Sequence, residues 1–255
     1  MGLDEKDAPP YATYVISEYD KHRTLRFADS EGKKRLLIMG DSFLQDLFNV
    51  MREGGFMDDM NVATHYIPAR CQNVPASAPY QQHIAAADIH DCRDTLRVGD
   101  AALDPLIKSA DIIIVTASWD AFTTSTLPVL YRDIKARTAA PVIIFGRKSF
   151  PGMSRQDILS LGSIEETYAL KKPLSNESHF TDIALAEKLM GGSEAYIDFH
   201  RLICGPGRTC PVTTPDGHAI SHDGAHLTRN GARFIAGLLQ QDRHFMKRWS
   251  AALND

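Results

Sequence analysis

Apolar residues gather in short, nearly continuous runs, and longer segments with helical spacing separate these runs along the chain. Short runs rich in Ile, Val and Leu are typical of strands that are buried on both faces of a parallel sheet. The runs predict strands at 35–40, 61–67, 111–117, 141–146 and 195–198, and the spaced segments predict helices at 43–53, 95–109, 126–138, 154–171, 181–191 and 228–240 or beyond. This alternation predicts a doubly wound, three-layer α/β/α fold around a mainly parallel five-stranded sheet.

Chain length and composition favour a single folded unit. With 255 residues, of which 44% are hydrophobic, the chain can bury a full core in one domain. It contains no internal repeat and no low-complexity segment. The N-terminal stretch is acidic and contains two prolines, so we expect a linker and a short adjunct over residues 1–30 and the folded domain over 31–255.

Charge and hydropathy exclude several classes of protein. The formal net charge is −4, charges of both signs are mixed along the chain, and no basic patch indicates a nucleic-acid partner. The longest apolar runs are far too short to span a bilayer. The N-terminus has neither the basic nor the apolar region of a signal peptide, so the chain as it stands predicts no export. We therefore expect a soluble globular chain.

The four cysteines form two local pairs, Cys71 with Cys92 and Cys204 with Cys210, in stretches rich in Pro, Gly and Asn. Loop pairs of this kind favour disulfides and an oxidising compartment over free thiols. A metal site is the weaker alternative, because neither pair has the two-residue spacing of a zinc knuckle and no His stands at a regular offset. Disulfides and the lack of an export signal are compatible if the chain is one domain of a longer exported or membrane protein.

The stretch RLLIMGDSFLQDLF, residues 35–48, places Ser42 where the first predicted strand turns into a helix. In open parallel sheets, ligands bind at the carboxyl ends of the strands, and the N–H groups of a first helical turn stabilise negative charge there. Ser42 is therefore a candidate nucleophile, with Gly40 allowing the tight turn. The alternative is that Ser42 only caps the helix, since Ser is a favoured cap.

A serine nucleophile needs a base, and the stretch SHDGAHLTRNGARFIAGLL, residues 221–239, offers His226. Asp223 stands three residues before His226, and both precede a segment with helical spacing. Asp223 can accept a hydrogen bond from one ring nitrogen while the other nitrogen takes the Ser42 proton. The alternative is an ordinary turn, in which Asp223 bonds local backbone and His226 is a polar loop residue.

The ordered pair of Gly-Asp-Ser at 40–42 and Asp-x-x-His at 223–226 resembles the SGNH hydrolase superfamily, also called GDSL-like. The resemblance spans nearly the whole expected domain and implies an SGNH hydrolase-like, flavodoxin-like fold. It also implies that Ser42 is the nucleophile and that Asp223 and His226 complete the triad. The folded domain would then be catalytic and would need no cofactor and no metal.

The third sequence block of that superfamily departs from the usual pattern here. Gly-x-Asn-Asp falls on ASWD, residues 117–120, so that Trp119 stands where the oxyanion-binding Asn would be. Trp119 and Tyr66 are candidates to stack on a sugar ring, although buried aromatic residues at strand ends more often belong to the core. Asp41 and Trp119 are candidate contacts of the oxyanion or the substrate, although for Asp41 we favour a role in ordering the Ser42 turn.

The second block departs as well. The glycine expected after the second strand is absent from IPARCQNV, residues 67–74, unless Gly54-Gly55 serve from an unexpected place. The backbone N–H of Ser42 remains as an oxyanion donor, and a backbone N–H in ARCQ can supply a second one. Arg70 and Cys71 are therefore candidate contacts of the oxyanion or the substrate.

The departures and the cysteines are similar to one branch of the superfamily, the SGNH domains fused to the membrane-bound acyltransferase family three. The loop from Cys204 to Cys210, Trp119 in TASW and Cys71 after the second strand match that branch. These proteins O-acetylate bacterial surface polysaccharides such as lipopolysaccharide. The resemblance therefore implies a periplasmic domain joined to a transmembrane acyltransferase domain, with residues 1–30 in the connecting extension.

We therefore expect serine-dependent acetyl transfer from an acyl donor to hydroxyl groups of a polysaccharide or oligosaccharide, through an acyl-enzyme on Ser42. Two alternatives stay open: a carbohydrate O-acetylesterase, in which water replaces the sugar, and a catalytically decayed module that only binds glycan. The triad does not separate transferase from esterase, because acceptor binding and water exclusion decide between them. Arg147 and Lys148 are candidates for contact with a glycan, but a solvated loop is the favoured interpretation.

Overall fold

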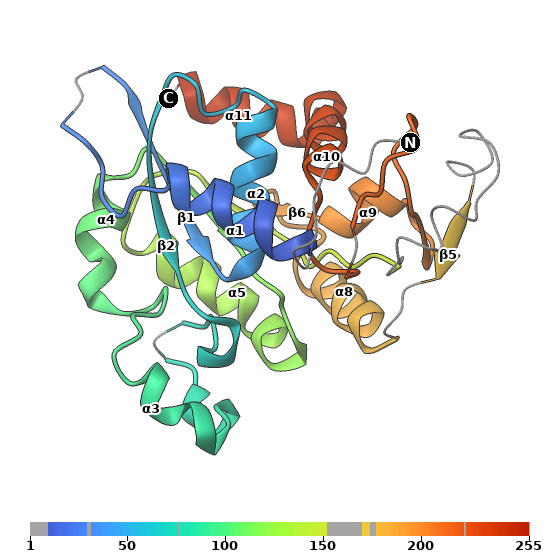
Figure 1. Ribbon diagram of the computed structural model, residues 1–255. Coiled ribbons are helices and arrows are strands. Elements are labelled where there is room, and N and C mark those ends of the chain that lie inside the picture. The colour runs from blue at the N-terminus through green and yellow to red at the C-terminus, as the bar shows by residue number, and fades with distance from the viewer. Residues whose placement is uncertain are drawn as a thin grey trace.

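Five parallel strands form the central sheet in the order β2-β1-β3-β4-β6 (Figure 1). The computed structural model describes residues 10–29, 32–75, 77–151, 170–173, 177–221 and 223–254. The strands of the sheet are β1 Lys34–Gly40, β2 Met60–Tyr66, β3 Ile112–Thr116, β4 Val142–Phe145 and β6 Tyr196–Ile197. The predicted doubly wound α/β fold is confirmed, and each of these strands begins and ends within one residue of the predicted bounds.

Helices connect the strands and cover the sheet on both sides. Their bounds are α1 Pro10–His22, α2 Ser42–Glu53, α3 Ile89–Cys92, α4 Asp104–Ser109, α5 Ala121–Lys135, α8 Glu177–Met190, α9 Phe199–Cys204, α10 Arg229–Gln241 and α11 Arg243–Asn254. Short 3-10 turns are η1 Ala69–Cys71, η2 Tyr80–His83, η3 Ala86–Asp88 and η4 Ala101–Leu103. Within the described part of the chain, no helix has the length and apolar character needed to cross a membrane.

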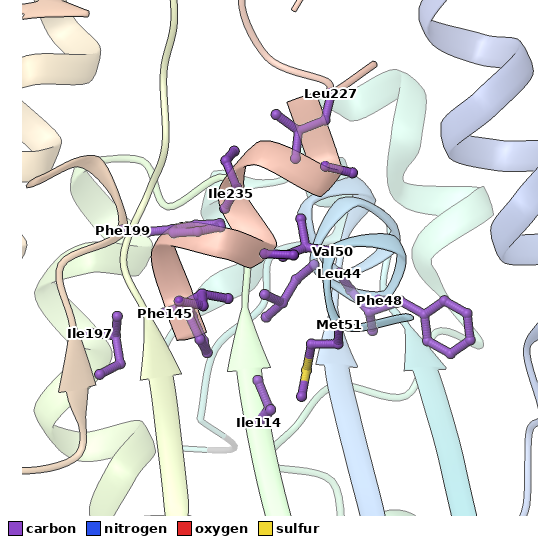
Figure 2. Packing of buried hydrophobic residues seen from close by; sticks show 14 of the residues in the cluster. Leu44, Phe48, Val50, Met51, Ile114, Phe145, Ile197, Phe199, Leu227 and Ile235 are labelled. Carbon is purple, nitrogen blue, oxygen red and sulfur yellow. The ribbon is translucent and has the colours of Figure 1, made fainter. Parts of the chain in front are cut away.

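Both faces of the sheet are buried. Successive side chains of each strand point to opposite sides, so neighbouring residues of one strand enter different apolar clusters. Leu36 and Ile38 of β1 lie in one apolar cluster, whereas Leu37 and Met39 lie in a second one. Helices α1, α2, α10 and α11 contribute to the first cluster, and α4, α5 and α8 contribute to the second. Figure 2 shows the first cluster, in which side chains of α2 and α10 pack over the strands.

The predicted helices at 43–53, 181–191 and 228–240 are present as α2, α8 and α10. Helix α5 begins earlier than the predicted 126, because Asp120 and Thr123 form a capping box that starts the helix. The helix predicted at 154–171 falls almost entirely outside the described residues.

The helix predicted over 95–109 is wrong in its first half. Helix α4 begins only at Asp104, with Pro105 in its first turn, where a missing N–H is tolerated. Ahead of it, the guanidinium of Arg97 donates to three backbone carbonyls at 3.0 to 3.2 Å and fixes an irregular path. This buried cation satisfies the backbone in place of helical hydrogen bonds.

Helix α1 belongs to the packed structure. It packs against α2 and buries Tyr14, Val15 and Tyr19 in the first apolar cluster. The Tyr19 hydroxyl donates to Thr64 Oγ1 of β2 at 3.0 Å. The packed structure therefore extends ahead of the expected start of the folded domain, while residues 1–9 of the expected linker lie outside the described residues.

Both predicted disulfides are present. Cys71–Cys92 closes the base of a long excursion between β2 and β3, and Figure 1 shows α3 of this excursion lying away from the sheet. Cys204–Cys210 joins the end of α9 to β7 Thr209–Pro211, which pairs in antiparallel fashion with β5 Lys171–Pro173.

Candidate active site

The turn that carries Ser42 results from the close approach of β1 to β3. Gly40, the last residue of β1, has a φ of +152°, and a Cβ atom there would lie 1.7 Å from the carbonyl oxygen of Thr116. Only glycine tolerates this conformation and this contact. The chain therefore turns directly from β1 into α2, and Ser42 is the first helical residue, half-buried at the carboxyl edge of the sheet.

Asp41 fixes this turn. Its Oδ1 accepts the N–H of Phe43 at 2.9 Å, and its Oδ2 accepts from the N–H and the hydroxyl of Ser118 at 2.8 and 2.5 Å. Burial raises the pKa of Asp41, although these hydrogen bonds favour its charged form. Because Asp41 is the N-cap of α2, the interpretation of Ser42 as a simple helix cap is wrong.

Asp223 and His226 form a hydrogen-bonded pair. Asp223 Oδ2 lies 2.7 Å from His226 Nδ1, and Asp223 Oδ1 accepts the N–H groups of Ala225 and His226 at 2.9 and 2.8 Å. Partial burial tends to raise the pKa of Asp223, but the hydrogen bonds from His226 and Ala225 outweigh it and hold this pKa well below the usual range. Asp223 therefore bonds the local backbone and also orients the imidazole through Nδ1, with Nε2 on the other side of the ring.

The start of α2 lies beside residues 223–228, which we call the dyad loop. The ring of Phe43, next to Ser42, lies edge-on to the His226 ring with centroids 6.5 Å apart. The N–H of Leu227 donates to Asp46 Oδ1 of α2 at 2.9 Å. The fold thus brings together the two motifs that the sequence separates by almost the whole domain.

A family model described as "SGNH domain (fused to AT3 domains)" matches residues 11–241 of the chain. The chain belongs to this family. The match runs from α1 to the end of α10, so it includes both the Ser42 turn and the dyad loop. No curated protein shows significant similarity to the chain.

A buried ion pair lies under the contact between α2 and the dyad loop of this SGNH domain. Lys148 Nζ donates to Asp46 Oδ2 at 2.7 Å and to the Ala225 carbonyl at 2.5 Å, and both charged side chains are fully buried. Lys148 Nζ also lies 3.4 Å from the ring centroid of Phe43. Burial lowers the pKa of Lys148, and the Asp46 carboxylate opposes that shift. The expectation of a solvated loop at Lys148 is therefore wrong.

The third block of the SGNH domain is built around two buried side chains. Trp119 is 1% exposed, and its indole N–H donates to the Phe145 carbonyl of β4 at 2.8 Å. The only donor of the Trp119 side chain is therefore occupied within the core. Arg147 is also largely buried: it donates to the carbonyls of Ser118 and Trp119 at 2.9 and 2.8 Å and lies 3.8 Å from Asp182.

The loop after β2 limits the possible oxyanion donors. The N–H groups of Cys71 and Gln72 already donate to the carbonyls of Pro68 and Ala69. Within ARCQ, the N–H groups of Ala69 and Arg70 are the ones that make no backbone hydrogen bond in the described part of the chain. The side chain of Cys71 is fully buried and bonded to Cys92 in a disulfide.

No sequence pattern indicated Asn73 as a candidate for the site. Its side chain is 2% exposed, and neither its amide nitrogen nor its oxygen has a hydrogen-bond partner among the described residues. Such a buried amide is uncommon and calls for an acceptor or donor from a ligand or water. By contrast, Gly54-Gly55 follow the far end of α2, about 18 Å from Ser42 by helical rise, and cannot contribute to the oxyanion site.

Polar and aromatic side chains of the excursion border this edge of the sheet. Arg70 is half-exposed and lies 3.5 Å from both Asp88 and Asp91. His83 of η2 stacks on Phe122 of α5, with ring centroids 3.5 Å apart and ring planes at 11°. The excursion is therefore docked on the start of α5, next to the end of β3.

Tyr66, at the end of β2, is partly exposed. Burial raises its pKa, the nearby Asp41 charge acts in the same direction, and Arg70 opposes them. Tyr66 therefore lies within electrostatic reach of both the Ser42 turn and Arg70.

Among the described residues, His200, Cys204 and Cys210 are the cluster with metal-ligand side chains. The two sulfur atoms form a disulfide with each other, so they are not thiolate ligands.

Proposed function

We propose that this SGNH domain transfers acyl groups, acetyl in particular, to hydroxyl groups of a bacterial cell-surface polysaccharide through an acyl-enzyme on Ser42. The observation that supports this most is the contact between the start of α2, which carries Ser42, and the dyad loop, in which Asp223 and His226 are hydrogen-bonded. The family supports the same class of chemistry, because its SGNH domains are fused to AT3 domains.

In the first step, Ser42 Oγ attacks the carbonyl carbon of the acyl donor while His226 Nε2 takes its proton. The imidazolium is stabilised by Asp223, which stays ionised because its pKa is low. His226 returns the proton to the leaving group, and an ester on Ser42 results. In the second step, His226 takes a proton from an acceptor hydroxyl, whose oxygen attacks the ester carbonyl. The bond to Ser42 Oγ breaks, and His226 returns the proton to that oxygen, which restores the free serine.

The oxyanion of each step is stabilised by the Ser42 N–H and by donors from the loop after β2. Ala69 and Arg70 offer backbone N–H groups there, and Asn73 offers an amide that is buried and unpaired among the described residues. These donors replace the side chain that Trp119 does not supply. Loss of one such donor costs roughly a hundredfold in rate.

The acceptor approaches over the carboxyl edge of the sheet. Tyr66 and the stacked His83–Phe122 pair give this edge aromatic surface beside polar groups such as Arg70. Amphipathic sugars suit a rim of this kind, because they present both apolar and hydroxyl faces.

The compartment is the periplasm, and the partner is a transmembrane acyltransferase domain that supplies the acyl group. Two disulfides support an oxidising compartment, and membership of the AT3-fused family supports the membrane partner.

The test is a partition experiment with p-nitrophenyl acetate as donor and a bacterial surface oligosaccharide as acceptor. We expect acetylated oligosaccharide by mass spectrometry, in amounts that rise with acceptor concentration while free acetate falls. Ser42→Ala should abolish both products, and Ser125→Ala, at an exposed serine of α5, should change neither.

Free acetate without any acetylated acceptor would identify the domain as an O-acetylesterase, which uses water in the second step. A folded protein that forms neither product and binds the oligosaccharide would identify a decayed glycan-binding module and contradict the proposal.

A further inference from the structure

We propose that Lys148 and Asp46 form a positioning pair that sets the register of His226 against Ser42. This inference rests on the proposed function, because it assigns a role to two residues that do not touch the reacting atoms. It arises from the placement of their hydrogen bonds, which act on the backbone groups on both sides of His226.

Asp46 lies four residues after Ser42, so the two side chains share one face of α2, one turn apart. That face points to the dyad loop, because Asp46 Oδ1 accepts the N–H of Leu227 at 2.9 Å. Asp46, on the same face of α2 as Ser42, is thus hydrogen-bonded to Leu227, the residue that follows His226.

Lys148 acts on the other side of the base. Its Nζ donates to the carbonyl of Ala225, the residue before His226, and to Asp46 Oδ2. The backbone before and after His226 is therefore tied to the same buried ion pair, and through Asp46 to α2. Phe43 completes the link, since its ring lies under Lys148 Nζ and edge-on to His226.

Within the described residues, two other sets of hydrogen bonds of the dyad loop do not connect it to α2. The Asp223–His226 hydrogen bonds lie within the dyad loop, so they fix the shape of the loop but not its distance from α2. The N–H of Phe150 donates to the Gly224 carbonyl, which ties the loop to the segment after β4 and not to the nucleophile helix.

A buried ion pair is weak evidence for a gain in stability, because desolvation of two charges offsets their attraction. An apolar pair of similar volume would fill the same space. The pair also makes directional bonds to two backbone groups, which an apolar pair lacks, and this supports a role in geometry.

The test is the rate at which a fluorophosphonate probe labels Ser42. In the pair variant Lys148→Met with Asp46→Asn, both charges are removed together, so no unpaired charge stays buried, and a folded protein is expected. We expect near-UV circular dichroism like that of the wild type and labelling about 10- to 100-fold slower, as for misplacement of a base by roughly 1 Å. Lys148→Met with Asp46→Leu serves as a second, apolar pair variant with the same expected loss.

A double-mutant cycle separates positioning from general loosening. If the pair acts through His226, adding the pair variant to His226→Ala should slow labelling by no more than about twofold. Lys148→Arg keeps a positive charge beside Asp46, so its labelling rate should lie between those of the pair variant and the wild type. Tyr19→Phe, which removes a buried hydrogen bond between α1 and β2, is the structural control and should label like the wild type.

Wild-type labelling by a folded pair variant would overturn this inference alone. The inference would also be overturned if the pair variant slowed labelling by the same factor in the His226→Ala background as in the wild type. An unlabelled wild-type domain would instead overturn the proposed function, and the inference with it.

Discussion

The turn that carries Ser42 is held by the backbone of the sheet, whereas the loop that carries His226 depends on side chains from distant segments. Gly40 lies in close contact with Thr116 of β3, and Asp41 accepts a hydrogen bond from Ser118. We therefore expect the Ser42 turn to form when the sheet folds. The dyad loop is partly exposed, and its contact with α2 is made by Asp46 and Lys148. Changes at the first region should therefore act on folding, whereas replacement of the whole ion pair in the second region should act mainly on the geometry of the base.

The largest effect is expected for Gly40→Ala, which breaks the first region. Its Cβ would meet the Thr116 carbonyl at 1.7 Å, so we expect a loss of more than about 4 kcal/mol in unfolding free energy, measured with urea. Gly32→Ala is the matched control: its φ is +79° but nothing lies within 4 Å, and about 1 kcal/mol should be lost. Equal losses in the two variants would show that backbone conformation, not the contact with β3, decides.

Lys148→Met alone tests the second region. It leaves the Asp46 carboxylate buried without its counter-charge, so we expect a loss of about 3–5 kcal/mol in unfolding free energy. Adding Asp46→Leu should recover most of that loss without recovering the labelling of Ser42. As a control, Arg233→Met breaks an exposed pair with Glu53 and should cost at most about 1 kcal/mol. Recovery of stability and labelling together would contradict a positional role.

A somewhat smaller effect is expected from the disulfide at the base of the excursion between β2 and β3. Cys71 and Cys92 are 21 residues apart, so replacing both by Ala should lower the unfolding free energy by about 3 kcal/mol. Cys204 and Cys210 are only 6 residues apart, and their replacement should cost about 2 kcal/mol. The reverse order in urea unfolding would show that local packing outweighs loop closure.

The smallest effect concerns Asp223 and depends on pH. Because its folded pKa lies below the unfolded value, the pair with His226 contributes stability that is present above about pH 4 and is lost as pH falls through the lower folded pKa. The stability gap between wild type and Asp223→Asn should therefore narrow as the pH falls from about 4.5 toward 3. Urea unfolding at each pH measures this gap. A gap that widens over this acidic range would contradict the assigned direction.

The sheet and the chemical motifs could be predicted from the sequence because local signals carry them. Buried parallel strands are continuous apolar runs. The turn after β1 accepts only glycine, so Gly40 in the sequence indicates that turn. The helix over 95–109 was wrong in its first half because Arg97 satisfies backbone carbonyls that are far apart in the sequence, which no local pattern reveals.

The support of the dyad loop could not be predicted for a similar reason. Lys148 follows a buried strand at a position where solvated charges are common, and its partner Asp46 is about a hundred residues away. One signal was present: Asp46 interrupts the apolar face of α2 one turn after Ser42. A charged residue within a buried helical face indicates a buried partner, although it does not identify that partner.

The most direct test of the central claim, that His226 activates Ser42, is fluorophosphonate labelling with the adduct located by peptide mass. We expect one adduct on the peptide that contains Ser42, none in Ser42→Ala, and a rate at least about a hundredfold lower in His226→Ala. A folded wild-type protein without an adduct on Ser42, or equal labelling rates in the wild type and His226→Ala, would contradict it.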